Sequence, residues 1–156
     1  MRLWVETPTR HSNGYQVGGD MVGVVVATHG DLATEFVRAA ELILGPMEKL
    51  VPVGFDPEEP PEQMETRLQL AIERCDGGDG VLVLVDMFGG TPSNLSIPWL
   101  REGQVEIVSG INLPMLLRVV DARHTYKLVE LAKQARHHGE KNILIVSEIM
   151  EARRRM

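Results

Sequence analysis

Apolar and polar positions alternate along the chain in a way that separates short strands from longer helices. From Met21 onward, runs of Val, Ile and Leu are followed by segments in which apolar residues recur every three or four positions. This pattern predicts an α/β domain with a mainly parallel sheet. A short run at 50–53 contains Pro52, which cannot donate a backbone hydrogen bond and therefore belongs at a sheet edge. The other runs are nearly continuous in apolar residues, as central strands covered on both faces are, and lie at 22–27, 81–85, 105–108 and 143–146.

Helix signals occupy the stretches between these runs. We expect Thr91 to be an N-cap followed by the first-turn Pro92, and Gly139 to end the last helix. Cys75 lies on the apolar face of a predicted helix and is expected in the core. Helical spacing bounded by Gly and Pro predicts helices at 32–43, 61–75, 91–100, from 112–114 onward, and 125–138.

Composition narrows the class of protein. A chain of 156 residues fits one compact domain that can bury a core without disulfides or metal ions. The net charge of -6 gives no general attraction to nucleic acid. Cys75 is the only cysteine, so no intramolecular disulfide can form, and no apolar stretch is long enough to cross a bilayer. The cytoplasm is the expected compartment.

The two ends of the chain differ from its middle. Residues 1–20 are polar and rich in turn formers, and they lack the unbroken apolar region of a secretory signal. We interpret 1–20 as an extension, whether a tag, a leader or a misassigned start, and 151–156 as a basic tail. The expected domain therefore spans 21–150.

Candidate chemistry falls in the loops that follow the strands. In open α/β sheets, ligands bind beyond the carboxyl ends of the strands, where the winding direction reverses. His29 follows the first predicted strand and Asp86 follows the third. A flavodoxin-like, doubly wound order of 2-1-3-4 makes these strands neighbours, so we expect His29 and Asp86 to face each other across the crevice.

This pair has a chemical use. A carboxylate that accepts a hydrogen bond from one imidazole nitrogen fixes the tautomer and leaves the other nitrogen with a free lone pair. That nitrogen can attack phosphorus, while the carboxylate stabilises the positive charge that develops on the ring. Gly89, Gly90 and Thr91, at a predicted helix N-terminus, offer backbone N–H groups to the transferred anion. The sequence therefore predicts His29 as the nucleophile and Asp86 as its orienting carboxylate.

Each of these signals also has a simpler interpretation. A single histidine after a strand is more often a structural or surface residue than a nucleophile. The Gly-Gly-Thr-Pro turn is equally compatible with ordinary helix capping, and Asp86 with capping of the same loop. Their joint occurrence at the ends of two apolar strands favours a functional site, since sites in α/β folds are built from these loops.

Three motifs in order make the chain recognisable. They are 28–30 (Thr-His-Gly), 86–94 (Asp-Met-Phe-Gly-Gly-Thr-Pro-Ser-Asn) and 110–115 (Gly-Ile-Asn-Leu-Pro-Met). The segment from Met21 to about Met150 resembles the mannose-family IIA component of the bacterial phosphoenolpyruvate-dependent sugar phosphotransferase system. The resemblance implies that His29 is phosphorylated, that Asp86 is its partner, and that no metal or cofactor takes part. The phosphate-facing wall would be Gly89, Gly90 and Thr91, with supporting residues Gly30, Ser93, Asn94 and Asn112.

The same resemblance implies protein partners. Family members receive phosphate from the phosphocarrier HPr and pass it to a IIB component, so contact with the membrane is indirect, through the permease. They form homodimers in which the last strand, here 142–146, can run antiparallel and be exchanged. Phe88, where some members have tryptophan, and Arg118 depart from the family pattern and leave partner choice open. The sugar is not readable from the sequence.

Three other functions remain as alternatives. The chain can be a regulatory IIA protein of an incomplete system, acting through phosphorylation-dependent partner binding. A flavin or nucleotide binder of the same fold is disfavoured, because no glycine-rich phosphate fingerprint follows the first strand. A histidine phosphatase is disfavoured because Thr28 stands where an arginine is expected.

Overall fold

Four parallel strands form the sheet at the centre of the molecule, in a computed structural model that describes residues 21–155. The strands are β1 (Gly23–His29), β2 (Leu50–Phe55), β3 (Val81–Val85) and β4 (Val105–Ser109). Their order is β2-β1-β3-β4, and every neighbouring pair is parallel. The predicted α/β class and the 2-1-3-4 order are therefore confirmed.

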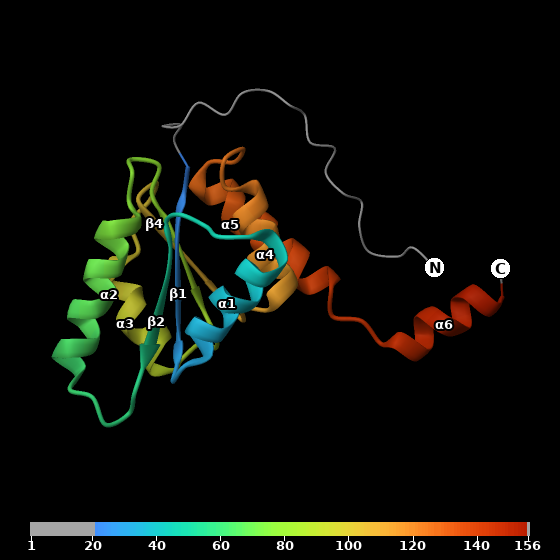
Figure 1. Ribbon diagram of the computed structural model, residues 1–156, viewed down its shortest axis with the longest axis horizontal. Helices are drawn as coiled ribbons and strands as arrows, with labels where there is room; N and C mark the ends of the chain where they lie inside the picture. Colours follow the sequence, from blue (N-terminus) through green and yellow to red (C-terminus); the bar gives the residue numbers. More distant parts are fainter. Residues whose placement is uncertain (1–20, 156) are drawn as a thin grey trace.

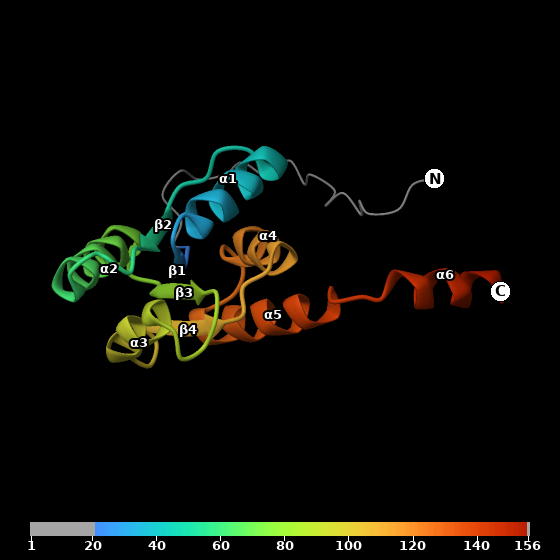
Figure 2. The same cartoon turned by 90° about the horizontal axis from the view of Figure 1, so that it is seen from below.

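Helices cover both faces of this sheet, which is why the strand runs are apolar on both sides. Helices α1 (Leu32–Leu44), α4 (Leu113–Ala122) and α5 (Leu128–Lys141) pack on one face, and α2 (Pro61–Cys75) and α3 (Thr91–Ser96) pack on the other. Figure 1 shows the two layers on either side of the strands, and Figure 2 shows the strand order from β2 to β4. Alternate residues of β1 point to opposite layers, Val24 to the first and Val25 to the second.

The predictions for Pro52 in β2 and for Cys75 in α2 are confirmed. Strand β2, which contains Pro52, lies at one edge of the sheet, where a missing N–H breaks no ladder bond to a further strand. Cys75 is fully buried at the end of α2, and its thiol donates to the Val24 carbonyl across 3.5 Å.

Several helix boundaries differ from the sequence-based expectation. Helix α3 ends at Ser96, and a 3-10 turn, η1 (Ile97–Trp99), follows it. Helix α5 continues through Gly139 to Lys141 instead of ending at the glycine. The glycine at this position serves packing and not helix termination, because a Cβ on Gly139 would lie 2.6 Å from the Met115 Cε of α4. Gly139 therefore allows α5 to approach α4 closely.

The prediction of a central strand at 143–146 is wrong for the single chain. The segment after α5 is irregular and leads into a last helix, α6 (Val146–Arg154), which projects from the domain (Figures 1 and 2). The side chains of Ile143 and Ile145 are 77% and 61% exposed. The run is apolar as a buried strand would be, but residues 21–155 of the single chain leave it exposed.

The ends of the chain are only partly described. The proposed extension at 1–20 lies outside the described residues, and the domain limits of 21–150 stay a prediction. Arg153 and Arg154 of the predicted basic tail form the last turn of α6. Within the described part of the chain, none of the helices combines the length and apolar character that a membrane span requires.

A buried arginine connects the loops at the amino ends of the strands. Arg123, just after α4, is only 4% exposed. Its guanidinium donates to the carbonyls of Glu48 and Lys49, at 2.6 and 3.1 Å, and its own carbonyl accepts from the Val22 N–H. These bonds connect α4 to the α1–β2 loop and to the start of β1.

We predict that Arg123→Ala lowers the free energy of unfolding by about 1.5–3 kcal/mol, because it removes the part-buried, charge-assisted hydrogen bonds to the Glu48 and Lys49 carbonyls. Equilibrium urea denaturation measures the change. Arg38→Ala is the matched control: the Arg38 side chain is 70% exposed on α1 and forms a 3.5 Å ion pair with the exposed Glu35, so its loss should cost less than about 0.5 kcal/mol. Equal losses in the two variants would contradict the assigned role of Arg123.

Candidate functional site

The parallel register brings His29 and Asp86 together. β1 and β3 are hydrogen-bonded neighbours in which Ala27 is paired with Val85. His29 is the last residue of β1, and Asp86 directly follows β3. The expected adjacency of these two residues is confirmed.

The Asp86 carboxylate is the centre of the local hydrogen bonds. Its Oδ2 accepts the backbone N–H of His29 at 2.9 Å and lies 2.8 Å from the His29 Nδ1. Its Oδ1 accepts the backbone N–H of Met87 at 2.9 Å. Because an ionised carboxylate only accepts hydrogen bonds, the neutral imidazole must carry its proton on Nδ1, which leaves the Nε2 lone pair free.

These contacts keep Asp86 ionised. Burial raises the pKa of the Asp86 carboxyl, but the hydrogen bonds from the His29 backbone and ring, the His29 charge and the Met87 N–H outweigh burial and lower the pKa below its ordinary value. The His29 side chain is 43% exposed, whereas that of Asp86 is 14% exposed. The site therefore presents an accessible nitrogen backed by a sheltered negative charge.

The glycine turn after Asp86 is held by the two polar residues that follow it. Gly89 has φ +83°, a conformation that favours glycine. The Ser93 hydroxyl accepts the Gly89 N–H at 3.4 Å, and the Asn94 amide donates to the Gly89 carbonyl at 3.3 Å. Ser93 and Asn94 thus stabilise the turn.

The cap of α3 differs by one residue from the prediction. Gly90, not Thr91, is the N-cap, and Thr91 is the first helical residue. Among residues 21–155, no protein acceptor is paired with the backbone N–H of Gly90 or Thr91. Both groups lie at the start of α3, where the first N–H groups of a helix have no partner within the helix.

Gly30 and Asn112 contribute to the loops around this edge of the sheet. Gly30, with φ +53°, turns the chain out of β1, and its N–H donates to the Phe55 carbonyl at 2.9 Å. The Asn112 amide group is engaged in the fold: its oxygen accepts the Met115 N–H and its nitrogen donates to the Gly139 carbonyl. Asn112 is therefore the N-cap of α4 and a link to α5.

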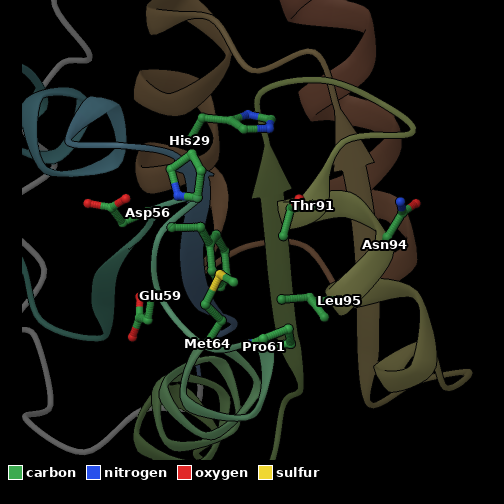
Figure 3. A pocket seen from close by; sticks show the side chains of 10 residues that line it. His29, Asp56, Glu59, Pro61, Met64, Thr91, Asn94 and Leu95 are labelled. Atoms are coloured by element: carbon green, nitrogen blue, oxygen red, sulfur yellow. The ribbon is translucent and has the colours of Figure 1, made fainter.

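A cleft of about 410 Å³ opens beside His29. Figure 3 shows His29 at one end of it, Thr91, Asn94 and Leu95 along one side, and Asp56 and Glu59 along the other. The β2–α2 part of this cleft was not predicted from the sequence. It could have been predicted from the parallel sheet, because the loop after β2 begins at the same edge of the sheet as His29. The lining residues not predicted from the sequence are Phe55, Asp56, Pro57, Glu59, Pro61, Met64 and Leu95.

Comparison with known proteins decides the family. The EIIA-man family, described as the PTS system fructose IIA component, matches residues 23–136, which include all four strands and most of α5. The chain belongs to the mannose family of phosphotransferase-system IIA components. IIA components are proteins of the phosphotransferase relay, so a general role in phosphoryl transfer follows from this membership.

Individual relatives agree with this assignment. The fructose-specific EIIA component of Bacillus subtilis (strain 168) is 29% identical over 132 residues, which are 84% of this chain and 90% of that protein. The mannose-specific EIIAB component of Escherichia coli (strain K12) is 31% identical over 125 residues, 77% of this chain but 39% of that protein. The crystal structure of EIIA from Streptococcus agalactiae has a TM-score of 0.75 at 25% identity and covers 82% of this chain and 99% of that one.

The geometry predicts how Asp86 responds to the loss of the ring. In His29→Ala the backbone N–H remains but the ring donor and its charge are gone, so the pKa of Asp86 should rise. Carboxyl ¹³C NMR titration measures this change. Because the pKa of Asp86 is lower in the folded than in the unfolded protein, Asp86 stabilises the fold above its unfolded pKa, and this stability is lost as pH falls through the folded pKa. In the variant, the part of the free energy of unfolding that is lost at low pH should therefore shrink.

His137→Ala is the control for this titration, because His137 lies on α5, and in the described part of the chain the ring bonded to Asp86 is that of His29. An unchanged Asp86 pKa in His29→Ala would show that the ring does not contribute to the depression.

Proposed function

We propose that the protein accepts a phosphoryl group from phospho-HPr on the Nε2 atom of His29 and donates it to a IIB component. The observation that carries the proposal is the double hydrogen bond from His29 to Asp86 Oδ2, which leaves Nε2 as the free ring nitrogen. This arrangement suits a relay of the family to which the chain belongs.

The transfer step follows from this arrangement. The Nε2 lone pair attacks phosphorus while the bond from phosphorus to the donor nitrogen breaks, and the electron pair of that bond stays with the donor. The His29 ring becomes cationic as the new bond forms, and Asp86 stabilises the charge through Nδ1–H. The same step runs in the other direction toward the acceptor, and it needs no metal or cofactor.

Two features suit a reversible carrier. The Gly90 and Thr91 N–H groups and the Thr91 hydroxyl are the proposed donors to the phosphoryl oxygens. Within residues 21–155, neither Lys nor Arg lines the cleft, so the anion would be held only moderately. A carrier must release its group, and an exposed site with neutral donors favours release.

Exposed apolar side chains surround the histidine, as expected where partner proteins dock and exclude water. Leu32, Met87 and Phe88 are 45%, 55% and 77% exposed. We place donor and acceptor on this surface in turn, in the cytoplasm, with the membrane reached only through the permease.

We also propose a homodimer in which the 142–146 segment pairs with the sheet of a second copy. β4 is an edge strand, and the apolar segment is exposed in the single chain. A groove of about 380 Å³ lies between β4 and α5 and offers a place for an added strand. Its lining residues are Glu106, Ile107, Val108, Ser109, Val129, Ala132, Lys133 and Arg136.

We expect the purified protein to be labelled by phosphoenolpyruvate with enzyme I and HPr, and His29→Ala to lose the label, because among residues 21–155 no other imidazole is bonded to a carboxylate. Intact-protein mass spectrometry at alkaline pH measures the phosphohistidine. His137→Ala is the matched histidine control and should label like the parent. A parent protein that stays unlabelled with active donor proteins would refute the relay.

A second stage separates transport from regulation. The phosphorylated protein is mixed with each IIB component encoded near its gene. Transfer to one of them supports the sugar relay, whereas stable phosphoprotein with every IIB favours the regulatory function.

The dimer proposal makes its own prediction. The parent should have the mass of a dimer in light scattering after size exclusion, and Ile143→Asp with Ile145→Asp should shift it to the monomer, because two buried carboxylates would oppose pairing. Leu70→Asp is the control, since Leu70 is 52% exposed on α2, beside the other edge of the sheet. A monomeric parent at micromolar concentration would overturn the proposal.

A further inference from the structure

The His29 ring has a second neighbour besides Asp86. A Cβ built on Gly90 would lie 2.6 Å from the ring Cε1 and 3.0 Å from Nε2. Carbon atoms in contact prefer a separation of about 3.5–4.0 Å. The imidazole therefore occupies the space that any side chain at position 90 would need.

The backbone does not itself require glycine at this position. Gly90 has φ -83° and ψ 171°, an extended conformation that every residue adopts. The preceding Gly89 is different, because its φ is +83° and a Cβ there meets nothing within 4 Å. Glycine is therefore needed at the two adjacent positions for separate reasons: Gly89 forms the turn, and Gly90 leaves room for the ring.

We propose that Gly90 is a positioning residue for His29: the bare Cα of Gly90 supports the Cε1–Nε2 edge of the ring while Asp86 holds Nδ1. The two contacts act on different atoms of the imidazole, one from each end of the loop that follows β3. Together they set the direction of Nε2. This inference rests on the proposed function for its catalytic consequence but not for the ring geometry.

A methyl group at Gly90 would displace the ring rather than unfold the protein. The other atom near the added Cβ, the Met87 Cγ at 3.4 Å, belongs to a half-exposed flexible side chain. The His29 side chain is 43% exposed and is free to rotate outward. To reach a normal contact distance the ring must move by about 1 Å, which breaks its alignment with Asp86 Oδ2.

The test is Gly90→Ala, with Gly77→Ala as the matched control. A Cβ on Gly77 meets only the ammonium end of the Lys49 side chain, far along a flexible chain, and Gly77 is not in a left-handed conformation. Both variants should unfold at the parent's urea midpoint. Ring ¹⁵N NMR should show His29 as the Nδ1–H tautomer in the parent and in Gly77→Ala, and a shift toward the Nε2–H tautomer in Gly90→Ala.

Phosphoryl acceptance from phospho-HPr should fall roughly 100-fold in Gly90→Ala alone, as for a reacting group displaced by about 1 Å. An unchanged tautomer in Gly90→Ala overturns the proposal, even if transfer is slowed. The added methyl group would then act on the phosphoryl group or on the partner protein and not on the His29 ring. If Gly90→Ala shifts the tautomer but the parent protein accepts no phosphate, the positioning role of Gly90 is supported and only the relay is refuted.

Discussion

The hydrogen bonds that converge on the Asp86 carboxylate determine the whole site. One oxygen accepts two N–H groups of His29, and the other accepts the N–H that begins the next turn. A single side chain thus joins the end of β1 to the end of β3 and selects the ring tautomer. The hydrogen bonds that it accepts lower the pKa of its carboxyl group. Without it, His29 would be an exposed histidine with no preferred nitrogen.

This interaction depends on the parallel sheet beneath it. Parallel strands have all their carboxyl ends at one edge, and the reversal of winding between β1 and β3 leaves that edge open. The helices on both faces bury the strands, so the residues that follow them are fixed by a rigid framework. Gly89, Ser93 and Asn94 then give the β3–α3 loop its own internal bonds.

In the proposed relay, strong orientation of the imidazole is combined with weak retention of the phosphoryl group. Orientation comes from the charge of Asp86 and, in our proposal, from the contact of the ring with Gly90. Retention of a phosphoryl group would rely on neutral N–H and hydroxyl donors in an open cleft. A relay benefits from this balance because rate depends on the alignment of the attacking nitrogen, whereas a tightly held product would not be passed on.

The sequence alone determined the four strands of the sheet, because apolar runs are local properties of the chain. Analogy with doubly wound folds then predicted the sheet order and the adjacency of His29 and Asp86. Tertiary structure decided which ring nitrogen is bonded, that Gly139 lies inside a helix, and that the segment from Phe55 to Met64 forms one side of the cleft. Each of these depends on distances between segments far apart in the chain. The 143–146 run shows the limit most clearly, since an apolar pattern reports that a segment needs burial but not which surface provides it.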